Sequence, residues 1–112
     1  MLRHIALFRF KPEATDEQIS AAMGALSALP DQIDALRKFR FGPDAGITDG
    51  AWDFAVVAVL DDADDYAEYR DHPAHVAALR DYVVPLLSEA ARIQFESEGE
   101  SAPRTQGSPR PI

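Results

Sequence analysis

The sequence contains no cysteine among its 112 residues. That absence excludes disulfide bonds, thiolate nucleophiles and zinc sites held by cysteine. Long apolar runs are also missing, so no segment has the length that a membrane-spanning helix needs. The N-terminus opens on an alternating pattern, without the apolar stretch of a secretory signal. We therefore expect a cytoplasmic protein with no membrane partner.

Positive charge is scarce, since 11 Lys and Arg residues stand against 19 Asp and Glu residues and give a formal net charge of −8. A field of this sign repels nucleic-acid phosphates, and we expect no nucleic-acid partner. The chain also lacks a phosphate-binding glycine loop, a nucleophile elbow and a zincin motif. No pattern in the sequence requires a cofactor, and we expect none.

A length of 112 residues suits a single domain. Helical spacing predicts one helix from Thr15 to Leu29, and a second from 63 to 87 that is interrupted at His72 and bent at Pro85. Alternation and short β-branched runs predict four strands, over residues 2–10, 36–42, 52–60 and 88–96. The order β-α-β-β-α-β is that of a ferredoxin-like α+β domain, in which both helices cover one face of a four-stranded antiparallel sheet.

Helices on one face leave the opposite face of the sheet uncovered. Ile5 and Leu7 of the first strand lie on that face, and we expect them to be joined by one set from Trp52, Phe54, Val56 and Ala58. An exposed apolar sheet face indicates a partner surface. Packing of two copies buries both faces, so we predict a homodimer with the architecture of a dimeric α/β barrel.

The domain is predicted to span residues 1–96. Residues 97–112 contain no aromatic residue and one large aliphatic residue, and they are rich in Ser, Pro, Gly and charge. This composition predicts a flexible C-terminal tail. A segment that drapes over a partner is the alternative.

Three histidines are the main candidates for chemistry, because histidine is the side chain most often used for proton transfer near neutral pH. His4 lies inside the first strand, and His72 and His75 flank a proline in the sequence HPAH. Each also has a structural interpretation. His4 can donate to a backbone carbonyl, His72 can close a helix end, and His75 can be a solvated surface residue.

The H-x-x-H spacing is compatible with two metal ligands on one helical face. Pro73 interrupts that helix, however, and no carboxylate at helical spacing completes a ligand set. We therefore expect no metal. Tyr69 is a further candidate, because a phenol can donate a hydrogen bond to a carbonyl or enolate oxygen, whereas Tyr66 and Tyr82 are expected to be half-buried packing residues.

Three segments carry a family resemblance: HIALFRFKPEATDEQI, GAWDFAVVAVLDD and YAEYRDHPAHVAAL. They resemble the stress-responsive dimeric A/B-barrel (Dabb) family from about His4 to Phe95. That resemblance implies a ferredoxin-like protomer that pairs by sheet packing. More distantly, the chain is similar to plant polyketide cyclases of the olivetolic acid cyclase type, which implies that His75 acts as the base, that Tyr69 assists it, and that His4 lines the pocket.

The chain departs from the cyclase pattern at two positions. Leu26 stands near a pocket tyrosine of the cyclases, and Asp53 stands near a pocket histidine. With these two departures, the resemblance still implies a homodimer with a small-molecule pocket. The chemistry that it implies is cyclase-like or isomerase-like proton transfer on a polyketide or aromatic compound. The predicted catalytic residues are His75 and Tyr69, and the predicted substrate-binding residues are His4, Phe8, Asp53 and His72.

Two alternatives stay open. The first is a non-catalytic, stress-associated dimeric module, in which the HPAH segment only shapes the helix and the dimer edge. The second is a cofactor-independent monooxygenase, which related dimeric barrels include. A cavity between helices and sheet favours an enzyme or a binder of a small hydrophobic or aromatic ligand. An interior filled by bulky side chains favours the module, and the candidates for filling it are Phe8, Met23, Leu26 and Trp52.

Overall fold

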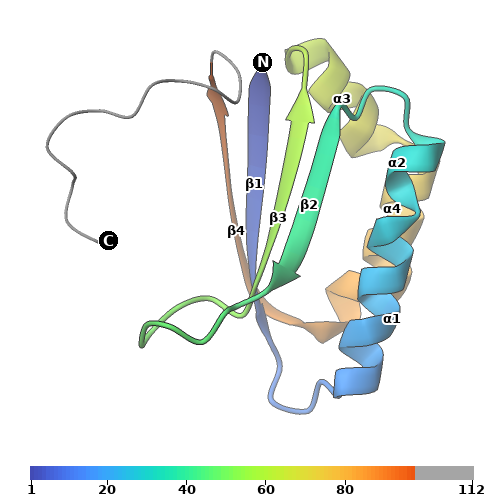
Figure 1. The fold of residues 1–112 in the computed structure, drawn as a ribbon. Coiled ribbons are helices and arrows are strands. Elements are labelled where there is room, and N and C mark those ends of the chain that lie inside the picture. The colour runs from blue at the N-terminus through green and yellow to red at the C-terminus, as the bar shows by residue number, and fades with distance from the viewer. Residues whose placement is uncertain (98–112) are drawn as a thin grey trace, which may run out of the picture.

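The computed structural model describes residues 1–97, in which a four-stranded antiparallel sheet carries the helices on one face (Figure 1). The strand order is β2-β3-β1-β4, so β1 and β3 are central and β2 and β4 form the edges. The strands span Leu2–Phe10 (β1), Lys38–Pro43 (β2), Phe54–Leu60 (β3) and Leu87–Glu96 (β4). No helix in this described part is long and apolar enough to cross a membrane.

The first helical region consists of α1 (Asp16–Ser27) and the short α2 (Leu29–Gln32). A capping box starts α1, in which the Thr15 hydroxyl accepts from the Gln18 N–H at 3.1 Å and the Gln18 side chain accepts from the Thr15 N–H at 2.9 Å. The prediction that one helix continues to Leu29 is wrong. Pro30 lies in the first turn of α2, where its missing N–H has no helical partner to lose.

The second helical region is broken into four pieces. They are α3 (Ala63–Asp71), α4 (Pro73–Ala78), a π-helical turn η1 (Leu79–Val83) and a 3₁₀ turn η2 (Val84–Leu86). The break at His72 and the disturbance near Pro85 were predicted, whereas the π-helical turn was not. A π-helical turn inserts an extra residue into a helix and often lies at a functional site.

The core lies between the helices and the sheet. Its most deeply buried large side chains are Leu29, Ile33, Leu60 and Val83. The pairing of β1 with β3 sets which side chains face this core, because Phe8, Ala6 and His4 lie opposite Phe54, Val56 and Ala58. All six therefore share the helix-covered face of the sheet.

The same register corrects the predicted composition of the uncovered face. Ile5 and Leu7 lie there as expected, but they pair with Val57 and Ala55, not with members of the Phe54, Val56 and Ala58 set. Trp52 precedes β3 and lies under the Arg9 guanidinium, 4.4 Å from its carbon to the ring centroid. Strand β4 contributes apolar side chains to the uncovered face, namely Ala91, Ile93 and Phe95.

The predicted tail, residues 97–112, lies outside the described residues except for Ser97. The Ser97 N–H donates to the carbonyl of Met1 at 2.8 Å. This hydrogen bond extends the pairing between β1 and β4 by one residue. The boundary of the domain at residue 96 stays a prediction.

Candidate functional site

A cavity of about 490 Å³ lies between the sheet and the broken second helical region. This volume is above the roughly 300 Å³ at which ligand sites begin. Phe8 and Leu26 form part of its wall but do not fill it, and Met23 and Trp52 are not in the wall. Most of the lining is apolar, and its polar members are His4, Tyr66, Tyr69, Arg70, His75 and Arg92.

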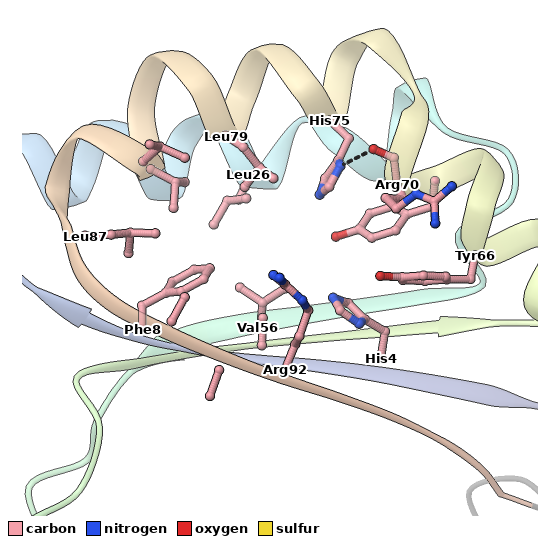
Figure 2. A pocket seen from close by; sticks show the side chains of 16 residues that line it. His4, Phe8, Leu26, Val56, Tyr66, Arg70, His75, Leu79, Leu87 and Arg92 are labelled. Atoms are coloured by element: carbon pink, nitrogen blue, oxygen red, sulfur yellow. Dashed lines mark hydrogen bonds between the residues drawn. The ribbon is translucent and has the colours of Figure 1, made fainter.

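His4 reaches the cavity from the sheet side (Figure 2). It is buried on β1, directly opposite Gln94 of β4, and its Nδ1 lies 2.7 Å from the Gln94 amide nitrogen. An amide NH₂ donates, so Nδ1 accepts this hydrogen bond. In the neutral ring the single proton is then on Nε2, which makes that nitrogen a donor.

His75 reaches the cavity from the helix side (Figure 2). Helix α3 ends before Pro73, and His72 starts α4 by accepting the Ala74 N–H on its Nδ1 at 3.0 Å. The break leaves the carbonyl of Arg70 without its helical partner, and His75 Nδ1 lies 3.0 Å from that oxygen. A carbonyl can only accept, so Nδ1 carries the proton and Nε2 keeps a free lone pair.

Two tyrosines of α3 complete the polar end of the cavity. The Tyr69 ring is 4.2 Å from the His75 ring and 6.1 Å from the His4 ring, measured between centroids. Tyr66 lies 5.0 Å from His4 by the same measure. Neither hydroxyl has a hydrogen-bond partner within residues 1–97. Both are therefore available to a ligand.

Burial sets the protonation states in the site. It lowers the pKa of His4 to about 4, with smaller contributions from His75 and Arg92. Burial also lowers the pKa of His75, more than the hydrogen bond to the Arg70 carbonyl raises it. For Tyr69, burial and then Tyr66 raise the pKa well above its ordinary value. At neutral pH the cavity thus holds two neutral imidazoles and a protonated phenol.

Comparison with known proteins places the chain in a family. Residues 2–97 match the Stress Responsive A/B Barrel Domain, or Dabb, family. The chain belongs to the Dabb family. An uncharacterised protein of Streptomyces coelicolor is 33% identical over 81 residues, which covers 70% of this chain and 84% of the relative.

Solved Dabb-like structures share the fold. A dimeric ferredoxin-like protein of unknown function from Thermobifida fusca is 45% identical, with a TM-score of 0.79 over 84% of this chain and 88% of that chain. A dimeric protein of unknown function with a ferredoxin-like fold from Bacteroides fragilis is 29% identical, with a TM-score of 0.72 over 86% of this chain and 95% of that chain. The predicted ferredoxin-like fold class is confirmed.

Four of the six site residues predicted for this Dabb chain meet at the cavity: His4, Phe8, Tyr69 and His75. Asp53 and His72 are not among the residues that line it. The Asp53 carboxylate accepts the N–H of Phe10 at 2.9 Å, and so holds the chain before β3 against the end of β1. His72 uses its ring to cap α4. Both positions serve local structure.

Three polar residues of the site were not selected from the sequence. Tyr66 was expected to be a packing residue. Arg92 and Gln94, which holds the His4 ring, were not among the predicted site residues. The signal that identifies Arg92 and Gln94 is the pairing of β4 with β1, which places them opposite Ala6 and His4. That register was not derivable from β4 alone.

No group of three or more His, Asp or Glu side chains in the described part of the chain is arranged to hold a metal ion. His72 and His75 do not act together, because each ring binds a different backbone group.

Proposed function

We propose that this Dabb protein catalyses proton transfer next to a carbonyl group in a small, largely apolar compound. His75 is the base and Tyr69 is the hydrogen-bond donor to the oxygen. The observation that supports this proposal is the hydrogen bond from His75 Nδ1 to the Arg70 carbonyl at 3.0 Å, since it leaves Nε2 as a free base in a cavity that also holds the Tyr69 hydroxyl.

The proposed reaction begins when His75 Nε2 takes a proton from the carbon beside the carbonyl. The electrons of the broken C–H bond form an enolate, and Tyr69 donates a hydrogen bond to its oxygen. In an isomerisation, the His75 imidazolium returns the proton to another carbon. In a ring closure, the enolate carbon attacks a second carbonyl of the same molecule, a C–C bond forms, and the imidazolium protonates the resulting alkoxide.

The test uses deuterium exchange with 4-oxo-4-phenylbutanoate, which has an apolar ring and exchangeable protons beside its ketone. We expect the protein in D₂O to accelerate loss of the corresponding ¹H NMR signal over buffer alone. His75→Gln should lower the catalysed rate at least about 100-fold, and Tyr69→Phe should lower it by roughly the same order.

Tyr82→Phe is the matched control for Tyr69→Phe, because it removes the same hydroxyl from an exposed tyrosine outside the cavity wall. This variant should catalyse deuterium exchange of the substrate at the wild-type rate. Equal rates for wild type and His75→Gln, with both folded, would reject His75 as the base and favour the non-catalytic module.

The proposed active form is a homodimer. The similar proteins from Thermobifida fusca and Bacteroides fragilis are described as dimeric. The uncovered sheet face of this chain is apolar at Ile5, Leu7 and Val57, and Ile93 on the same face is 59% exposed. Burial of such a face against a second copy is the simplest way to remove it from water. A role in stress and a cytoplasmic location stay predictions.

A further inference from the structure

The charged side chains of the cavity are of one sign. Among the described residues, its wall contains Arg70 and Arg92 but no Asp or Glu. Arg70 is neutralised by its neighbour Asp71, with both guanidinium–carboxylate hydrogen bonds at 2.9 Å. Arg92 is therefore the only charged group of the wall whose charge the described residues leave uncompensated.

Arg92 lies on β4 opposite Ala6, on the face of the sheet that the helices cover. Figure 2 shows its side chain rising from the strand into the cavity, between Phe8 and His4. It makes no ion pair and no hydrogen bond within residues 1–97. The contrast with other arginines of the chain is clear, since four have carboxylate partners: Arg9, Arg37, Arg70 and Arg80.

Arg92 is a solvent-exposed residue of the cavity wall, and an arginine without a carboxylate partner at that position favours one kind of ligand group. The guanidinium keeps its charge at all ordinary pH values, and its two parallel N–H groups match the two oxygens of a carboxylate. Acidic residues outnumber basic ones by 19 to 11 in this chain, yet no Asp or Glu among residues 1–97 forms an ion pair with Arg92. A single positive charge balances a carboxylate, whereas a phosphate dianion would keep one charge unbalanced in a largely apolar cavity.

We propose that Arg92 binds the carboxylate of the substrate and thereby restricts this cavity to organic acids with an apolar body and a carbonyl group. The assignment rests on the proposed proton-transfer function and narrows its substrate class. Arg92 lies two residues along β4 from Gln94, which faces His4. Two residues span about 7 Å, so a carbonyl two or three carbons from the carboxylate can reach the histidines while the acid group stays at Arg92.

The test compares 4-oxo-4-phenylbutanoate with its neutral amide, 4-oxo-4-phenylbutanamide, in binding to the full-length protein by calorimetry. Wild type should bind the acid at least ten-fold more tightly than the amide. Arg92→Gln should bring the ratio of the two affinities close to one, and Arg92→Lys should keep part of the preference. The control is Arg80→Gln, an exposed arginine outside the cavity wall, which should keep the wild-type ratio.

Equal binding of acid and amide to wild type, or an unchanged ratio in Arg92→Gln, would overturn the role of Arg92. The amide also separates this inference from the proposed function, because it has the same exchangeable protons. If the wild-type protein catalyses deuterium exchange of the amide and binds acid and amide equally, His75 remains the proposed base. Only the assignment of Arg92 to a substrate carboxylate is then rejected. Binding of the acid with preference but without exchange supports Arg92 and rejects the catalytic proposal. Absence of binding of both compounds at millimolar concentration rejects the acid assignment.

Discussion

Two imidazole rings face the cavity with opposite hydrogen-bonding character. Each has one nitrogen engaged by a hydrogen-bond partner, the Gln94 amide NH₂ group for His4 and the Arg70 backbone carbonyl for His75. The remaining nitrogen is therefore a donor on His4 and an acceptor on His75. A carbonyl compound between them can meet a base on one side and a hydrogen-bond donor on the other.

The neutral state of His4 makes stability depend on pH. Its folded pKa of about 4 lies below the unfolded value of 6.5, so the unfolded chain binds more protons between these values. The stabilisation is present above pH 6.5 and is lost as the pH falls towards 4. Between pH 7 and pH 5, we expect this group to reduce the free energy of unfolding by about 2 kcal/mol.

Urea unfolding at a fixed protein concentration measures this effect. Between pH 7 and pH 5, the free energy of unfolding of His4→Gln should fall by about 2 kcal/mol less than that of wild type. The control Tyr82→Phe changes an exposed residue outside the cavity and leaves all three histidines in place, so it should follow the wild-type pH dependence. An identical pH dependence for His4→Gln and wild type would show that His4 is not held neutral by the fold.

Single residues of the site differed in how far the sequence could identify them. His75 and Tyr69 are close in sequence, and the family resemblance implied both. Their convergence with His4 depends on packing of α3 and α4 over β1, which no local pattern contains. Asp53 and His72 have the right chemistry for a site, but local backbone groups use it. Tyr66 and Arg92 have no distinguishing local pattern, and only the strand register and helix packing bring them to the cavity.

At the scale of elements, the break between α3 and α4 positions the proposed base. It frees the Arg70 carbonyl that orients His75, and His72 stabilises the new helix start. We expect His72→Ala to lower the free energy of unfolding by about 1 kcal/mol, because the Ala74 N–H loses its cap. His72→Asn should restore most of this stability, since asparagine is a good N-cap residue.

Denaturant unfolding of the two variants, together with the exchange rate, checks the prediction. When both variants are folded, His72→Ala should catalyse deuterium exchange of the substrate more slowly than His72→Asn. The reason is that a frayed start of α4 moves His75. If His72→Asn loses as much stability as His72→Ala, the ring of His72 has a role other than capping.

The elements themselves were predicted well where one physical signal dominates. Strand β1 and helix α3 have the predicted bounds. Alternation sets the bounds of β1. Helix α3 is capped at its start by Asp62, whose carboxylate accepts the Asp65 N–H at 2.9 Å, and it ends before Pro73. The errors lie where signals compete. The predicted first helix ended at Leu29, just before Pro30, but proline also suits the start of a helix, and Pro30 lies in the first turn of α2. The local sequence has no marker for the π-helical turn at Leu79–Val83.

At the scale of the whole molecule, the uncovered sheet face predicts the assembly. Ile93 is 59% exposed at the edge of that face, while Val76 of α4 is 44% exposed on the helical side. We expect wild type to scatter light with twice the 12.3 kDa mass of one chain. Ile93→Lys should shift the equilibrium to the monomer, because it places a charge in an apolar interface.

Val76→Lys is the matched control, since it introduces the same charge at an exposed apolar position on the opposite side of the molecule. It should leave the dimer mass unchanged at the same low micromolar concentration. A monomeric wild-type protein, or a dimer that survives Ile93→Lys and dissociates in Val76→Lys, would contradict assembly through the sheet.

His75 is proposed to be a neutral imidazole with a free Nε2 lone pair in the cavity, and ¹⁵N NMR of the histidine side chains tests this claim most directly. We predict that His75 at pH 7 carries its proton on Nδ1, that its Nε2 is unprotonated, and that it titrates below pH 6.5, because burial lowers its pKa. A proton on Nε2 of His75 at pH 7, or titration above pH 6.5, would contradict the account, because the cavity would then hold a donor where the mechanism needs a base.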